Sequence, residues 1–164
     1  GFDVYNYIQY KKIEIRGVEM NLHYHPHQIH NLHLEQTYSL LQTDNKDSEY
    51  GLALTPANSV TSRILLDLND YESLRKYKLE YISCDHTFNF WQESVADFEQ
   101  KTPSYYVINA QIGFRFNNYL KGLVGVYNIL NESYTPHTSR LRNVTANGVP
   151  NPGRFFSVNL KYKF

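Results

Sequence analysis

The 164-residue sequence lacks several features that mark common classes of protein. Its formal net charge is zero, whereas a nucleic-acid-binding domain usually carries a basic excess. Its single cysteine, Cys84, excludes an internal disulfide. No apolar run approaches the roughly 18 residues of a transmembrane helix. The sequence therefore points away from nucleic acid as a partner, from a disulfide framework and from a membrane-spanning helix.

Patterns that carry catalysis are also missing. The sequence has no glycine-rich phosphate loop, no serine in a nucleophile-elbow context and no paired acids with a supporting site. We therefore expect no catalytic residue, no enzyme activity and no cofactor.

What the sequence does contain is aromatic residues, at 15% of the chain, and period-two alternation. The alternation is strictest over residues 154–164. Its apolar members are Phe156, Val158, Leu160, Tyr162 and Phe164, and its polar members are Ser157, Asn159, Lys161 and Lys163. An extended strand of this pattern has one apolar and one polar face. A strand that ends the chain on an aromatic residue is typical of the closing strand of a transmembrane barrel.

The same alternation predicts an all-β fold, an antiparallel up-and-down meander of about seven long strands. The expected strands are 10–24, 31–43, 59–68, 75–91, 105–116, 119–130 and 154–164. We expect a bulge at Gly17, where the phase slips, and a hairpin turn at Asn117 and Asn118 in left-handed geometry. The phase of strand 75–91 blurs near Ile82, so its faces stay unassigned.

The connections alternate between short and long along the whole chain. The long ones are 44–58, 92–104 and 131–153. Outer-membrane barrels sort their connections in this way, with short periplasmic turns and long extracellular loops. Single-chain bacterial barrels have an even number of strands from eight upward. Seven strands, with no initial methionine and no signal peptide, therefore predict that 1–164 is one incomplete C-terminal part of a larger barrel.

Several motifs resemble those of TonB-dependent outer-membrane receptors of the metal and siderophore type. The run from Leu123 to Tyr134 resembles the family's V-x-N-L-x-(D/N)-x-x-Y signature, and His137 to Leu141 resembles the segment that follows it. Pro152 to Phe156 resembles the family's P-G-R entry to the last strand. Tyr7 to Tyr10 and Ile15 to Glu19 resemble an upstream strand of the same barrels.

The resemblance implies a barrel of about 22 strands, plugged by an N-terminal domain that this sequence does not contain. It implies active uptake of a ferric siderophore, haem or another metal complex as ligand, energised by the TonB complex through the absent plug region. The other implied partners are outer-membrane lipid and the barrel-assembly machinery. Leu160, Tyr162 and Phe164 resemble the signal that this machinery reads.

Candidate ligand-binding residues are few. His137 lies on the last long loop with Tyr134 and Arg140 nearby, so these three are candidates for substrate contact. Five histidines fall between His23 and His33, and the spacing of His23 and His25 puts them on one strand face, which can suit Zn or Cu. Because they surround an expected periplasmic turn, a solvated polar turn is the favoured interpretation, and no metal site is assigned.

Two further groups follow from the expected strand faces. Glu35, Arg63, Asp67, Arg115 and Lys161 should project into the lumen as a hydrated wall. An aromatic girdle at the membrane interfaces should include Tyr81, Trp91, Tyr106, Phe116 and Tyr162.

Two other interpretations of the sequence remain open. One is a different outer-membrane barrel, a passive porin or an adhesin, which would lack the plug. The other is a soluble β-sandwich binding module, which would fold in buffer without detergent.

Overall fold

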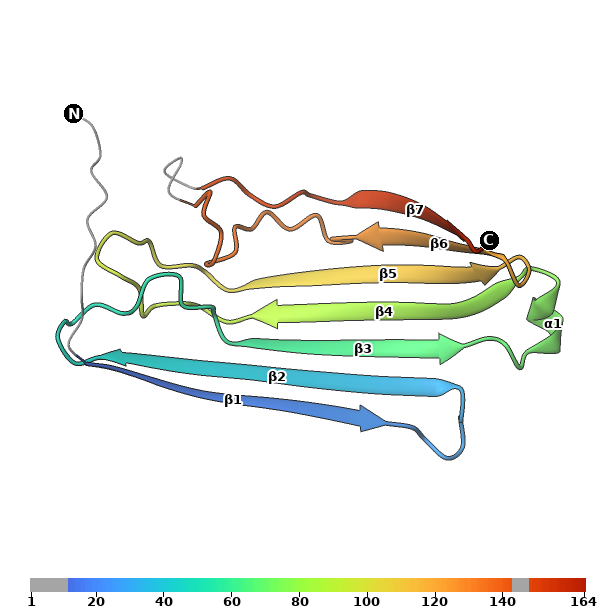
Figure 1. Ribbon diagram of the computed structural model, residues 1–164, viewed down its shortest axis with the longest axis horizontal. Helices are drawn as coiled ribbons and strands as arrows, with labels where there is room; N and C mark the ends of the chain where they lie inside the picture. Colours follow the sequence, from blue (N-terminus) through green and yellow to red (C-terminus); the bar gives the residue numbers. More distant parts are fainter. Residues whose placement is uncertain (1–11, 143–147) are drawn as a thin grey trace.

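The computed structural model describes residues 12–142 and 148–164, which form one seven-stranded antiparallel sheet in the order β1 to β7 (Figure 1). The strands are β1 (Ile13–Tyr24), β2 (Leu32–Asn45), β3 (Ser59–Asp67), β4 (Leu79–Asn89), β5 (Tyr105–Arg115), β6 (Leu120–Tyr127) and β7 (Phe155–Tyr162). Each strand pairs with its neighbours in sequence, and β1 and β7 form the two edges. The predicted all-β meander is confirmed. The motif at Tyr7 to Tyr10 lies outside the described residues.

The long and short connections lie at opposite ends of this sheet (Figure 1). Residues 46–58, 90–104 and 128–154 connect strands at one end, and 25–31, 68–78 and 116–119 connect them at the other. The predicted alternation of loop lengths is therefore present. In one connection the prediction is wrong: 68–78 contains the short helix α1 (Glu72–Arg75), which the expected strand 75–91 overran. No helix in the described ranges is long and apolar enough to cross a membrane.

The start of β4 explains why its sequence pattern was hard to read. Lys78 has a φ of 59°, and the pairing of β4 with β5 shifts between Leu79 and Tyr81. Tyr81 consequently lies over Gly113, where a methyl group would be 2.3 Å from Cε1 of the tyrosine ring. Tyr81 pairs with Asp67 and so shares the polar face. Its assignment to an aromatic girdle on the apolar face is wrong.

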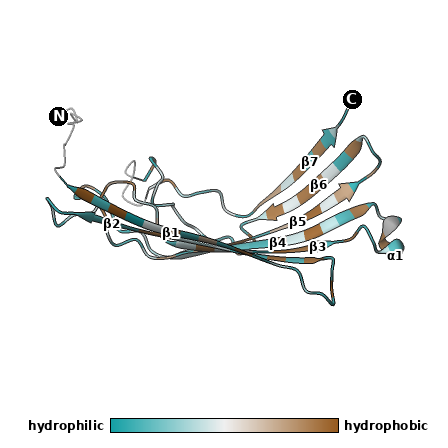
Figure 2. Ribbon diagram, turned by 60° about the horizontal axis from the view of Figure 1, so that its bottom comes forward, coloured by the Kyte–Doolittle hydropathy of each residue, from teal (hydrophilic) through white to brown (hydrophobic). Residues whose placement is uncertain are grey.

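The two faces of the sheet differ in chemistry. Apolar side chains on one face are strongly exposed: Val18 is 64% exposed, Ile64 51%, Phe156 74% and Val158 70%. Figure 2 shows the alternation of hydrophobic and hydrophilic residues along the twisted strands. In the described ranges, only Leu68, Ala96 and Val107 are buried hydrophobic residues. A soluble β-sandwich buries apolar side chains between two sheets. A single sheet with an exposed apolar face overturns that alternative.

The polar face carries the charges expected for it. The strand register places Glu35 beside Arg63 and Arg63 beside Asp85. The Arg63 guanidinium binds the Asp85 carboxylate and lies 4.0 Å from Glu35. Further along, Glu80 pairs with both Arg115 and Lys121. The register also puts Asp67 and Lys161 on this face, so the predicted wall of paired charges is present.

The expected bulge at Gly17 is absent. β1 and β2 pair without interruption from Ile13 and Asn45 to Tyr24 and Leu34. Because the register never slips, Ile13 and Ile15 share the polar face with Gly17. A methyl group at Gly17 would lie 3.3 Å from Cδ1 of Leu41, so the glycine accommodates its cross-strand neighbour. The phase change in the sequence therefore marks apolar residues on the polar face.

Candidate functional site

The long loop 128–154 starts at a buried asparagine that closes it. Asn128 is 3% exposed and has a φ of 50°. Its Oδ1 accepts the backbone N–H of Glu132 at 2.9 Å, and its Nδ2 donates to the carbonyls of Glu132 at 2.8 Å and Pro152 at 3.2 Å. Asn109 of β5 accepts the backbone N–H of Asn128 at 3.0 Å. Asn128 therefore joins the two ends of the loop to the sheet.

A second asparagine, Asn131, binds the C-terminal end of the same loop. Its φ is 56°, a left-handed conformation that asparagine tolerates better than most residues. Its Oδ1 accepts the backbone N–H of Arg154 at 2.9 Å. A methyl group at Gly153 would lie 2.6 Å from that oxygen, so glycine is needed there. These motif residues therefore have a structural role in this chain.

A buried histidine ties the three long loops together. His137 is 3% exposed, and its Nδ1 lies 2.7 Å from Oγ1 of Thr102. Its Nε2 lies 3.6 Å from Oε2 of Glu99. The Glu99 carboxylate also accepts the backbone N–H of Leu54 at 2.8 Å and of Ala96 at 3.0 Å. Residues from all three loops therefore converge on one buried carboxylate and one imidazole.

Burial controls the charge of this cluster. Burial lowers the pKa of His137, and the neighbouring Glu99 carboxylate only partly opposes that shift. Burial also lowers the pKa of Arg142, which nevertheless stays charged because its ordinary value is so high. His137 is therefore neutral at pH 7. Nε2 faces the Glu99 carboxylate at 3.6 Å, which favours the tautomer with the proton on Nε2 and with Nδ1 as acceptor of the Thr102 hydroxyl.

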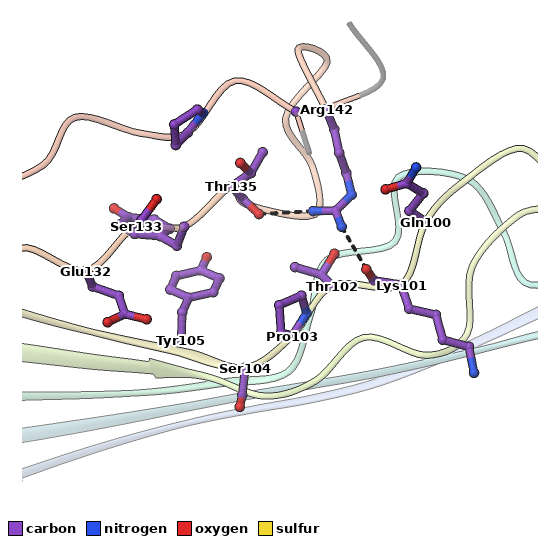
Figure 3. Close-up of a pocket in the computed structure, with 13 residues that line it drawn as sticks. Gln100, Lys101, Thr102, Pro103, Ser104, Tyr105, Glu132, Ser133, Thr135 and Arg142 are labelled. Carbon is purple, nitrogen blue, oxygen red and sulfur yellow. Dashed lines mark hydrogen bonds between the residues drawn. The ribbon is translucent and has the colours of Figure 1, made fainter. Parts of the chain in front are cut away.

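A cavity of about 600 Å³ lies between loops 90–104 and 128–154, beside this cluster (Figure 3). Arg142 spans it, donating to the carbonyl of Thr135 at 3.1 Å and to that of Lys101 at 2.8 Å. The Tyr105 and Tyr134 rings stack with centroids 4.3 Å apart. The other lining residues are Gln100, Thr102, Pro103, Ser104, Glu132, Ser133, Gly148 and Pro150. Stacked rings beside hydroxyls, carbonyls and charges suit a polar ligand with a flat portion.

The three predicted contact residues occupy different environments. Tyr134 lines the cavity. His137 is not a lining residue but contacts the lining residue Thr102. Arg140 is exposed and is not among the lining residues. Substrate contact by these residues stays a prediction. Arg142 was not predicted, although it lies two residues from Arg140, because no sequence pattern shows which of the two arginines turns toward the cavity.

Two other predicted groups are also placed by the structure. Leu160, Tyr162 and Phe164 are 70%, 58% and 106% exposed, at or just beyond the end of the edge strand β7. Recognition of these residues by the assembly machinery stays a prediction. Of the five histidines between His23 and His33, three lie close together on the polar face: His23, His25 and His33. The other two, His27 and His30, are not part of this group.

Comparisons with known proteins give a likeness of fold. No family model and no curated protein sequence match the chain. Among solved structures, the chain is similar to the copper transporter OprC with a TM-score of 0.79 at 18% identity. The match covers 93% of this chain and 24% of that one. The chain thus spans about a quarter of that transporter's length, and the likeness defines the class of fold, a segment of a β-barrel wall.

Proposed function

We propose that this chain forms part of the wall of an outer-membrane β-barrel that imports a metal ion or metal complex. The observation that carries the proposal is the strongly exposed apolar face of a sheet whose other face holds paired charges. In a barrel, outward apolar residues contact lipid and inward polar residues line a hydrated interior. The sorting of loops to one end supports the same orientation.

The proposal also concerns the identity of the imported metal species. The family resemblance favours a ferric siderophore, haem or another metal complex, and the likeness to a copper transporter adds copper to the candidates. Uptake would be energised through TonB acting on a plug region outside these residues. The cavity beside Tyr105 and Tyr134 is the candidate place of first capture, because it opens among the long loops that would face the outside.

A matched pair of substitutions on β7 tests the orientation of the sheet. Val158→Arg places a charge on the exposed apolar face, and Ser157→Arg places it on the polar face. A lipid-facing arginine costs about 2–4 kcal/mol near the membrane midplane. We expect Val158→Arg to lower stability by this order, and Ser157→Arg to change it by less than about 1 kcal/mol. Denaturant titration in lipid vesicles measures both, and equal effects would contradict the proposed orientation.

Uptake measurements separate the proposal from its main rival. A passive porin or adhesin would show no dependence on TonB, whereas the proposed receptor loses uptake when TonB is deleted. Cells lacking the gene should be compared with wild type for accumulation of copper, ferric siderophore, haem and zinc. Unchanged accumulation of every cargo would remove the metal assignment. If deleting the gene lowered accumulation by the same amount in cells with and without TonB, the passive barrel would be favoured.

A further inference from the structure

The strand register brings three histidines together at the short-turn end of the sheet. β1 and β2 pair His23 with Glu35 and Tyr24 with Leu34. His25 follows directly after β1, and its ring lies beside that of His33 in β2. Because alternate residues of a strand share a face, His23 and His25 project on the same side as His33. The cluster follows from the position of these residues on the hairpin.

The distances within this cluster are short. The ring centroids of His23 and His25 are 4.2 Å apart, those of His25 and His33 4.3 Å, and those of His23 and His33 5.8 Å. One nitrogen from each ring lies within 4.8 Å of the others. A tetrahedral Zn²⁺ site has Zn–N distances of about 2.0–2.1 Å, so its ligand atoms lie about 3.4 Å apart. Small side-chain rotations would close the difference, and the exposed His23 and His25 can make them.

From this geometry we propose that His23, His25 and His33 form a binding site for a divalent first-row transition cation, Zn²⁺ or Cu²⁺. Imidazole nitrogen is a preferred ligand of both ions. Three protein ligands leave a coordination position open for water, so the site would hold an exchangeable ion.

Glu35 supports this site from the neighbouring strand. Its Oε1 lies 3.9 Å from Nε2 of His23, and its Oε2 lies 4.0 Å from the Arg63 guanidinium. Metal-bound histidines commonly donate their second N–H to a carboxylate, which fixes the ring orientation. In the metal-bound form, a shift of about 1 Å would let Glu35 accept this N–H of His23. The main ion-pair partner of Arg63 is Asp85, so the Glu35 carboxylate can still accept a hydrogen bond from His23.

The site lies on the polar face, at the opposite end of the sheet from the loop cavity (Figure 1). It depends only on the pairing of β1 with β2, and so it stands or fails independently of the proposed transport. His27 and His30 belong to the same connection but not to the cluster. His30 instead lies 3.6 Å from Asp70. These two residues provide matched controls, since they change the histidine count without changing the site.

The test measures metal binding by the whole protein that carries this chain, purified in detergent. Competition with a chromogenic chelator gives the number and affinity of Zn²⁺ and Cu²⁺ sites. We expect His25→Ala and His33→Ala each to remove one site or weaken it at least tenfold, and His27→Ala and His30→Ala to leave it unchanged. Electron paramagnetic resonance of the Cu²⁺ form should show nitrogen coupling that decreases in His25→Ala.

Heat-modifiable migration on gels checks that each variant is folded. A variant that fails this check is replaced by a second measurement on the wild type, the protection of His25 and His33 from diethyl pyrocarbonate by Zn²⁺. Equal metal stoichiometry and affinity in wild type and folded His25→Ala would overturn the proposal. So would a loss in His27→Ala as large as in His25→Ala, or modification of His25 and His33 that Zn²⁺ does not slow.

Discussion

The two ends of the sheet use the same residue types in opposite ways. At the long-loop end, Asn128 and His137 are each 3% exposed; Asn128 binds both ends of its own loop, and His137 contacts Thr102 of a neighbouring loop. At the short-turn end, Asn117 is exposed and the His23 side chain is 48% exposed. The difference follows from what surrounds them: loop residues enclose the first pair, and a short chain reversal leaves the second open to solvent.

This comparison indicates where stability and adaptability lie in the sheet. A buried polar group that loses its partner costs the full desolvation penalty, whereas an exposed one can turn to water. Substitutions of buried polar residues at the loop end should therefore lower the free energy of unfolding strongly. Substitutions of the exposed histidines at the turn end should change it little, and these side chains are accessible to an ion.

The largest effect is expected for Asn128→Ala. It removes the side-chain hydrogen bonds to Glu132 and Pro152 and places alanine at a φ of 50°. At about 1 kcal/mol per hydrogen bond plus backbone strain, the free energy of unfolding should fall by about 2–4 kcal/mol. Denaturant titration of the folded protein in detergent measures this.

Asn128→Gly separates the two causes, because glycine tolerates the left-handed conformation but lacks the amide. Asn128→Gly should therefore lose only the stability that the hydrogen bonds contribute, whereas Asn128→Ala also carries the backbone strain. If both variants matched wild type, the loop would not depend on Asn128, and the packed character of this end would be contradicted.

An intermediate, pH-dependent effect is expected for His137→Gln. At pH 7.5 the lost contacts with Thr102 and Glu99 should cost about 1–3 kcal/mol. Burial holds the pKa of folded His137 below the ordinary value of 6.5, so the unfolded chain binds a proton first as pH falls. Stability from neutral His137 is therefore fully present above about 6.5 and is lost as pH falls toward the folded pKa. The variant should lose that acid dependence.

His27→Gln provides the control from the other end of the sheet. His27 is exposed in the β1–β2 connection, so its replacement should leave both stability and the pH profile unchanged. Unfolding should be followed between pH 5 and 8 for wild type and both variants. An acid-dependent loss that persists in His137→Gln would assign the titration to another group.

The sequence predicts the strands of the sheet better than the contacts made by the connections at its two ends. Period-two alternation identifies the two faces, because the exposed apolar side chains lie on one side of the sheet and ion pairs such as Arg63–Asp85 lie on the other. It fails at Gly17, where Ile13 and Ile15 lie on the polar face without any slip of register. It also fails at β4, because a register shift after the helical turn is invisible in a pattern of single residues.

The sites are less predictable because they depend on contacts between distant segments. Nothing near His137 in the sequence shows that Thr102 and Glu99 will surround it. The grouping of His23, His25 and His33, by contrast, follows from the β1–β2 register. The sequence supplied the face of His23 and His25, but the pairing with β2 was needed to place His33 opposite them.

The smallest effect is expected for Asn117→Ala at the turn between β5 and β6. The turn was predicted, but the left-handed geometry was not found: the non-glycine residues with positive φ in the described ranges are Leu54, Lys78, Asn128 and Asn131. The Asn117 side chain instead accepts the backbone N–H groups of Tyr119 and Leu120, each at 2.8 Å. Water can replace this acceptor at an exposed turn, so the loss should be only about 0.5–1 kcal/mol. Asn118→Ala is the neighbouring control. A cost for Asn117→Ala equal to that of Asn128→Ala would mean that burial does not separate the two ends, because an asparagine side chain would then contribute equally in solvent and in a buried position.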